Sequence, residues 1–346
     1  MRRYLLLTTF LLAAMALMLC LALPAVGQAE DQQADLIESY VRDISVGQPT
    51  GVGSLVVFPL YSRAGFPEGT KIQSVGEAMA SEDIIIREMP GGMDQRFLMA
   101  SNNSDGGVFG QYGGGYGGGG QGRGGGGGFY MAPLSSAKLP VVCYEEGRMG
   151  GDSPFFEPTS YHLAHPALRG LSVTGNQEAV WREIGRQHRL LDPLPVAIPI
   201  DEYTSPAYSS LRSTGGVVSA QQHLWRTAPT LAADANGVLV ACGDRILGID
   251  FYGDADLFTQ CRQDVLDSYA MVNAEVGSHV RCTVTDQGIA KFLADLVGAP
   301  RTARESVQLG DTAGIAFGNH AGEALALEGH LIYLGAHDTR PPPGVR

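Results

Sequence analysis

The chain has 346 residues, of which 44% are hydrophobic and 17% are charged, as in an ordinary globular protein. Its formal net charge is −12 and Lys and Arg form no cluster, which argues against a nucleic-acid partner, because phosphate binding needs grouped cations. The length allows one large domain or two small ones.

The N-terminal segment predicts export from the cytoplasm. Arg2 and Arg3 precede an almost continuous apolar run over residues 4–23, and small residues follow up to Ala29. This is the order of a secretory signal peptide. We expect cleavage after Ala29, with cleavage after Gly27 as the alternative, and a periplasmic or secreted protein.

A second interpretation of the same segment is an uncleaved membrane anchor, since about 20 apolar residues span a bilayer. Lipid attachment at Cys20 is disfavoured because the preceding Leu19 is large. The first 29 residues carry two of the 24 basic residues and none of the 36 acidic ones, so their removal leaves a net charge of about −14.

The first third of the mature chain predicts short alternating elements. Residues 30–49 form an acidic entry segment with a short helix over 34–43. Apolar alternation then predicts strands, and one short apolar stretch predicts a helix. The strands are expected over residues 52–62, 83–88 and 95–100, and the helix over 74–80.

A glycine-rich segment interrupts this pattern. Residues 106–128 hold 16 of the 47 glycines. Burying so few apolar side chains cannot offset the conformational entropy that the segment would lose on ordering. We therefore predict a long disordered insertion over residues 104–130. Gly-x-Gly-x-x-Gly strings occur in it by composition alone, and no helix pattern follows as a phosphate loop requires.

The middle of the chain predicts a strand and then a helix. Residues 139–145 (LPVVCYE) read as a strand, and Thr174 and Gln177 stand at the spacing of a helix-capping box. The helix is expected to run to Leu191, before Asp192-Pro193 ends it. Residues 201–236 are ambiguous, with one short helix expected near 203–213.

The last third predicts a hairpin, two helices and three more strands. Two apolar runs over residues 238–252 are joined by Gly243-Asp244, which suits a tight turn. Asp254 and Asp286 are expected to cap the two helices. Strands over residues 312–317, 323–327 and 331–336 predict an antiparallel meander within residues 304–337, followed by a flexible tail, 338–346.

This order of elements favours an α+β fold, because helices and strands come in blocks rather than in regular alternation. We expect a mixed, mostly antiparallel sheet with flanking helices, in a single domain over residues 50–337. No segment of the sequence reads as a linker between domains.

Two short motifs contain the residue types of a metal or catalytic site but lack the context that such a site needs. His162 and His165 have the spacing of a metal pair on a helix, but Pro166 follows and no third ligand is evident, so ordinary surface histidines are expected. The segment Gly151-Asp152-Ser153 is not part of a Gly-x-Ser-x-Gly elbow. The sequence predicts no metal and no cofactor.

Three charged residues are better candidates for a ligand site. Asp250 interrupts the apolar run over residues 246–252, and it either faces solvent or needs a buried partner. Glu145 and Arg148 follow a strand, where a carboxylate and a guanidinium can position a polar ligand or form a structural ion pair.

Residues 140–148 (PVVCYEEGR) resemble a Pro-Val-x-Cys-x-Glu-x-Gly-Arg motif of the ARG and Rhodanese-Phosphatase-superfamily-associated Protein domain family. Residues 53–60 are similar to the opening strand of that family, residues 177–181 (QEAVW) to its Gln-x-x-Val-Trp helix start, and residues 237–269 to its hairpin and helix. The resemblance covers residues 50–275 and adds Gln177 and Trp181 to the candidate ligand-binding residues.

The resemblance implies a role near ADP-ribose or nucleotide metabolism. The chain departs from the family pattern before the cysteine motif, where an acidic-Gly-Glu segment and a Gly-Ala-Lys-Gln-Asn-Arg segment are replaced by the glycine-rich residues. Cys143 matches a family position. Cys261 and Cys282 are additions, and a bridge between them is a hypothesis that follows from this comparison, with free thiols as the alternative.

Three functions remain open from the sequence. The first is an exported, non-catalytic domain that binds a partner protein or a small polar ligand. The second is an enzyme acting on an ADP-ribose or nucleotide-like substrate through Glu145, Arg148 and Asp250. The third is a structural envelope protein that uses the glycine-rich segment for contacts. A pocket that joins the three charged residues would favour a ligand or an enzyme.

Overall fold

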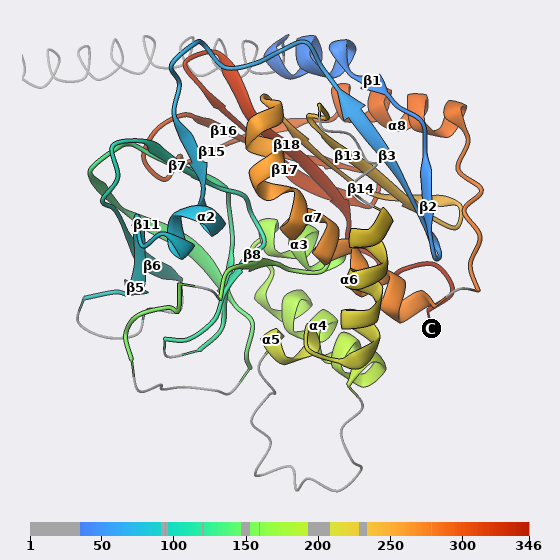
Figure 1. The fold of residues 1–346 in the computed structure, drawn as a ribbon, viewed down its shortest axis with the longest axis horizontal. Coiled ribbons are helices and arrows are strands. Elements are labelled where there is room, and N and C mark those ends of the chain that lie inside the picture. The colour runs from blue at the N-terminus through green and yellow to red at the C-terminus, as the bar shows by residue number, and fades with distance from the viewer. Residues whose placement is uncertain are drawn as a thin grey trace, which may run out of the picture.

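The computed structural model describes residues 35–90, 94, 96–119, 121–146, 153–158, 160–192, 208–227, 234–277 and 279–345. Within these residues the fold is α+β, and every strand pairing is antiparallel except that of β4 with β7 (Figure 1). This confirms the predicted fold class. The predicted N-terminal signal lies outside the described residues.

A nine-stranded sheet forms the centre of the molecule. Its order is β1-β3-β13-β14-β18-β17-β16-β15, with β2 also paired to β3. The strands are β1 (Ser45–Val46), β2 (Thr50–Val52), β3 (Leu55–Tyr61), β13 (Gly237–Cys242), β14 (Arg245–Tyr252), β15 (Arg301–Arg304), β16 (Asp311–Phe317), β17 (His320–Leu327) and β18 (His330–Asp338).

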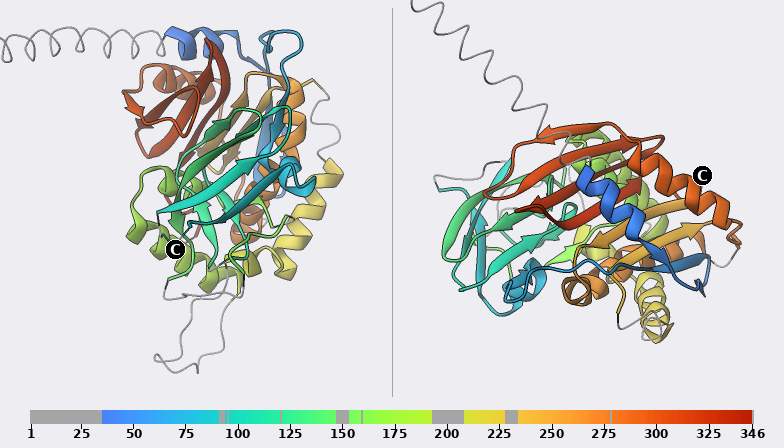
Figure 2. Two further views of the ribbon diagram at one scale, coloured as in Figure 1. Left: turned by 90° about the vertical axis from the view of Figure 1, so that its left-hand side faces the viewer. Right: turned by 90° about the horizontal axis from the view of Figure 1, so that it is seen from above.

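Helices cover both faces of this sheet because its strands bury apolar side chains on both sides. One core joins the sheet to α6 (Gly215–Thr227) and the long α7 (Ala255–Val276). The other joins it to α8 (Asp286–Val297) and to the helix over residues 35–43. Figure 2 shows α8 and the N-terminal helix lying on one side of the sheet.

Two smaller sheets pack beside the central one. The first has the order β10-β7-β4, and the second has the order β12-β8-β9-β11-β6-β5. Their strands are β4 (Ile72–Ser74), β5 (Ile84–Glu88), β6 (Phe97–Asn102), β7 (Gly107–Gly110), β8 (Gly114–Tyr116), β9 (Arg123–Gly125), β10 (Phe129–Met131), β11 (Ser135–Cys143) and β12 (His162–Leu163). The helices nearby are α2 (Val75–Ala80), α3 (Pro166–Val173), α4 (Gln177–Leu191) and α5 (Tyr208–Leu211).

The glycine-rich segment differs from its predicted disorder. It forms β7, β8 and β9 and leads into β10, and most of its described residues are buried. The physical reason is that its glycines leave space for large side chains from neighbouring strands. A Cβ atom at Gly107, Gly110 or Gly124 would overlap the ring of Tyr130, Phe129 or Tyr144, respectively.

Two of the predicted helix caps are wrong by one or two residues. The side chain of Asn176, not Thr174, accepts the hydrogen bond that caps α4, and Thr285 rather than Asp286 caps α8. Asp254 caps α7 as predicted. The expected hairpin is also confirmed, with β13 and β14 joined through Gly243 at a φ of 61°.

Candidate functional site

Asp250 lies at the centre of a closed hydrogen-bond network. Its side chain is fully buried on β14, and the equally buried Arg169 of α3 forms an ion pair with it. Two tyrosine hydroxyls also donate to the carboxylate, from Tyr333 at 2.6 Å and Tyr269 at 3.1 Å. Of the two orientations that the sequence allows, the structure has the buried one, with partners.

His337 completes this network as a neutral side chain. Its Nε2–H donates to Asp250 at 3.2 Å, and its Nδ1 accepts from the Tyr112 hydroxyl at 2.7 Å. Burial and the nearby Arg169 charge lower the pKa of His337 to about 4. Burial alone would raise the pKa of Asp250, but Arg169 and His337 hold it well below its ordinary value. Asp250 is therefore a charged structural centre between sheet and helix.

Glu145 lies in a different part of the molecule, directly after β11. Its carboxylate is buried and accepts a 2.8 Å hydrogen bond from the backbone N–H of Gly122, between β8 and β9. The glycine-rich segment and the cysteine motif therefore meet at this carboxylate. Arg148 lies outside the described residues, so the predicted set of three is not brought together among the residues that the structure describes.

The two candidate residues from the helix start support the strand rather than line a cavity. The side-chain amide of Gln177 brackets Cys143: it donates to the backbone carbonyl at 2.6 Å and accepts from the backbone N–H at 2.8 Å. Trp181, one turn further along α4, is partly buried. Burial raises the pKa of the Cys143 thiol, against its hydrogen bond to the backbone carbonyl of Glu145.

A pocket of about 550 Å³ opens beside Glu145, between β8 and α5, and we call it the glycine-walled pocket. One wall is backbone from the glycine-rich segment, and the others are aromatic and charged side chains. Its lining residues are Tyr116, Gly117, Gly118, Gly122, Arg123, Tyr144, Glu145, Glu157, Ser160, Tyr161, His162, Tyr208, Ser209 and Arg212.

His162 lines this pocket and also carries a buried hydrogen-bond acceptor without a partner. Its ring is 4% exposed, and its Nδ1 lies 2.8 Å from the carbonyl oxygen of Ser160. Because a carbonyl only accepts, Nδ1 carries the proton and Nε2 keeps a lone pair. That Nε2 is buried without a hydrogen-bond partner.

The two histidines that the sequence placed on the surface are both buried. His162 stacks on Tyr208 with ring centroids 6.1 Å apart, and His165 is 1% exposed at the start of α3. The error arose because the loop-like composition before Pro166 hides the two-residue strand β12, which pairs with β8. Among the described residues no group of three His, Cys, Asp or Glu side chains is placed to hold a metal ion.

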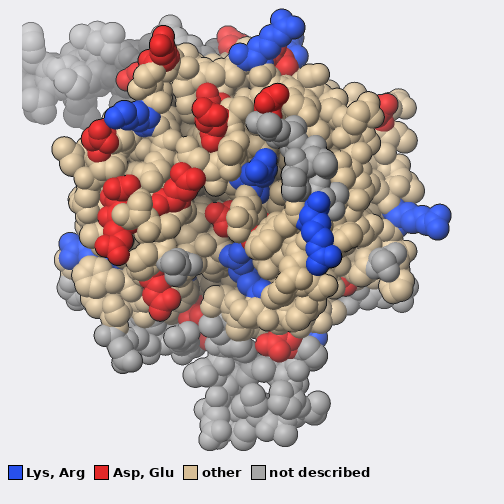
Figure 3. All heavy atoms as spheres, viewed as in Figure 1, with Lys and Arg blue, Asp and Glu red and all other residues tan. Residues whose placement is uncertain are grey.

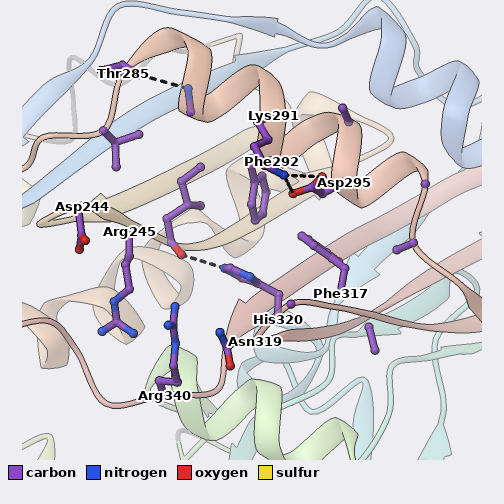
Figure 4. A pocket seen from close by; sticks show the side chains of 18 of the residues that line it. Asp244, Arg245, Thr285, Lys291, Phe292, Asp295, Phe317, Asn319, His320 and Arg340 are labelled. Atoms are coloured by element: carbon purple, nitrogen blue, oxygen red, sulfur yellow. Dashed lines mark hydrogen bonds and ion pairs between the residues drawn. The ribbon is translucent and has the colours of Figure 1, made fainter.

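A second and larger cavity, of about 780 Å³, lies between α8 and the turns at one end of the central sheet (Figure 4). None of the residues predicted for a site lines it. Most of its charged side chains have ion-pair partners: Lys291 pairs with Asp295, and Arg245 and Arg340 share Asp338 behind the lining. Its His320 donates from Nε2 to the carbonyl of Ile246. The glycine-walled pocket is therefore the better candidate site.

The hypothesis of a Cys261–Cys282 bridge is not supported, because all four described cysteines are free thiols. Cys261 is buried in the core on the α7 side of the central sheet, whereas Cys282 packs against the core on the opposite side. The two therefore lie in different cores, which the spacing in the sequence could not reveal.

The surface is consistent with the acidic composition. On the face shown in Figure 3, acidic side chains gather over the left-hand half, where β5, β6 and β11 lie, and basic side chains are scattered. None of the helices in the described part of the chain is both long and apolar enough to cross a membrane.

Comparison with known proteins gives one match. The family model of the ARG and Rhodanese-Phosphatase-superfamily-associated Protein domain matches residues 43–337, which include the central sheet, the glycine-rich segment and the glycine-walled pocket. Neither the curated proteins nor the solved structures include a significant match to the chain.

Proposed function

The chain belongs to the ARG and Rhodanese-Phosphatase-superfamily-associated Protein domain family, and we propose that it serves as an exported, non-catalytic domain that binds a small polar ligand in the glycine-walled pocket. The observation that carries this proposal is the pocket itself, whose lining gathers polar side chains from separate segments, including Glu145, His162 and Arg212. Pockets with a few convergent polar groups are the usual sites of small ligands.

The geometry of the charged residues favours binding over catalysis. Asp250 is fully buried and engaged by Arg169, His337 and two tyrosines, and it is absent from the pocket lining. A general acid or base must reach the reacting group within hydrogen-bond distance. Asp250 therefore cannot act together with Glu145 and Arg148 on one substrate, which argues against an enzyme that uses all three residues.

The pocket can be tested by filling it from its rim. Ser209 is exposed on α5 and lines the pocket, whereas the neighbouring Ser210 is exposed and does not. We expect a ligand from a screen of amines, sugars, nucleotides and ADP-ribose to raise the melting temperature of the wild type and of Ser210→Trp. The same ligand should leave the melting temperature of Ser209→Trp unchanged. A ligand stabilises a protein only when it binds the folded state, and the added indole ring would block the pocket.

The outcome of this screen is decisive in both directions. A ligand that stabilises Ser209→Trp as strongly as the wild type binds elsewhere and would contradict the assignment of the pocket. If no compound in these classes stabilises the wild type, the proposed small-ligand function is contradicted. The next experiment is then to capture a partner protein. Measuring the melting temperature over a range of concentrations of each compound separates specific binding from a general solvent effect.

Export has its own test. The basic start, apolar run and small residues before Glu30 support removal of the first 29 residues. We expect the protein produced from the full-length gene in its natural host to be recovered outside the cytoplasm with Glu30 as its first residue, or Gln28 if cleavage follows Gly27. N-terminal sequencing and intact mass of each cell fraction measure this. A membrane-bound product that keeps Arg2 and Arg3 would establish the anchor instead.

A further inference from the structure

Glu323 is a buried carboxylate that joins the central sheet to the glycine-rich segment. It lies on β17 with a side chain that is 1% exposed, and its Oε1 accepts a 2.6 Å hydrogen bond from the backbone N–H of Gly128. Gly128 belongs to the turn over residues 126–128, which connects β9 to β10. The carboxylate therefore fixes this turn against the sheet.

Glycines surround this carboxylate. Its cross-strand neighbours are Gly314 on β16 and Gly335 on β18, so neither adjacent strand places a side chain directly beside it. On the side of the turn, a Cβ at Gly128 would lie only 2.6 Å from Oε1. The contact between Glu323 and the turn therefore depends on a glycine at position 128.

The burial of this carboxylate is only partly compensated. Its Oε2 is buried and has no hydrogen-bond partner among the described residues. Nη1 of Arg304 lies 3.7 Å from Oε2, beyond hydrogen-bond distance, while Nη2 of Arg304 donates to the carbonyl of Val173 at 2.6 Å. An ionised carboxylate in such a site is costly. Burial accordingly raises the pKa of Glu323 to about 7, against the attraction of Arg304 and the Gly128 N–H.

The other charged and titratable groups described around Glu323 are engaged with one another. Tyr112, between β7 and β8, places its hydroxyl group over Gly335 and donates it to His337. Beyond Gly335 lie the members of the Asp250 network on β14, β18 and α3, namely Asp250, Tyr333, His337 and Arg169. Protonation of Glu323 is therefore governed by its burial, by Arg304 and by the turn.

We propose that Glu323 is a pH-sensitive latch, which holds the turn over residues 126–128 closed when it is protonated and loosens the turn when it ionises. The neutral acid keeps Oε1 as an acceptor for Gly128 without burying a charge. The ionised form is stabilised by water, and opening of the turn admits water because Gly126 and Gly127 are already partly exposed. Mildly acidic conditions thus favour the closed segment, whatever the glycine-walled pocket binds.

The direct test measures urea unfolding of residues 30–346 at pH 5.5 and at pH 8.5. A carboxyl whose pKa is raised by folding stabilises the protein fully below its unfolded pKa, and this contribution is lost as the pH rises through the folded pKa. For an unfolded pKa of about 4.3, Glu323 should increase the unfolding equilibrium constant of the wild type by about thirtyfold between the two pH values. Glu323→Gln keeps the shape and the acceptor without the titration, and should lack this factor.

Glu305→Gln is the matched control. It makes the same change of charge at an exposed position, one residue after β15, and should keep the pH dependence of the wild type. If the unfolding constant of Glu323→Gln increases with pH as steeply as that of Glu305→Gln, Glu323 does not titrate in this range and the latch is refuted.

Hydrogen–deuterium exchange of the wild type tests the loosening itself and does not depend on how well a variant folds. After correction for the intrinsic exchange rate at each pH, the amides of residues 126–128 should exchange at least about tenfold faster at pH 8.5 than at pH 5.5. Equal protection at the two pH values would overturn the proposal, because the ionised carboxylate would then hold the turn as firmly as the neutral acid.

Discussion

Asp250→Asn is expected to lower the free energy of unfolding by about 3–5 kcal/mol, the usual effect of breaking a fully buried ion pair from one side. The variant keeps the shape of the side chain but leaves the Arg169 guanidinium buried without a counter-charge. Tyr333, Tyr269 and His337 would then donate to a neutral amide, which accepts more weakly than a carboxylate. Urea unfolding followed by circular dichroism measures the change.

A surface pair supplies the matched control. Asp295 pairs with Lys291 four residues earlier on α8, and both side chains are largely exposed. Asp295→Asn should change the free energy of unfolding by less than about 1 kcal/mol. If Asp250→Asn is as mild as Asp295→Asn, the buried network contributes little, and the structural role assigned to Asp250 is incorrect.

The Asp250–Arg169 ion pair also predicts how the stability of the protein depends on pH. The folded-state pKa of Asp250 lies below the ordinary value of about 3.9. A carboxyl whose pKa is depressed by folding stabilises the protein fully above its unfolded pKa, and this contribution is lost as the pH falls towards the folded pKa. The free energy of unfolding of the wild type should therefore decrease as the pH is lowered below about 4. The Asp250→Asn variant should lack the part of this decrease that Asp250 causes.

The sequence predicted the regular elements well because their signals are local. Alternating apolar residues located β3, β5, β6 and the β13–β14 hairpin, and the Asp254 cap located the start of α7. The sequence does not determine whether Asp250 is buried, because its partners are distant along the chain. Arg169 is 81 residues away in the chain and His337 is 87 residues away, so no local pattern could reveal either partner.

The pocket could be predicted only in part. Glu145 was found through the motif that contains it, but its hydrogen-bond partner Gly122 belongs to the segment that composition assigned to disorder. The sequence predicts a surface position for His162, because the two-residue strand that buries it is too short for a periodic signal. The spacing of glycines between Tyr112 and Phe129 could have suggested strands with room for neighbouring rings, but many disordered segments have the same composition.

Gly124→Ala tests directly whether the glycine-rich segment is packed. A Cβ at this position would overlap the buried ring of Tyr144, so the ring or the strand would have to shift. Forcing extra volume into a packed interior usually costs about 1–3 kcal/mol, sometimes more. We expect a loss within that range in urea unfolding, because the added atom meets Cζ, Cε1 and the hydroxyl oxygen of one buried ring.

The neighbouring glycine in the same strand is the control. A Cβ at Gly125 would meet its nearest atoms at 3.6 Å, which is ordinary van der Waals contact. Gly125→Ala should therefore change stability by less than about 1 kcal/mol, since it adds little strain and reduces the entropy of the unfolded chain. A disordered segment would tolerate both substitutions equally. A large difference between adjacent glycines arises only if the strand is fixed against Tyr144, and that same packing forms the wall of the pocket.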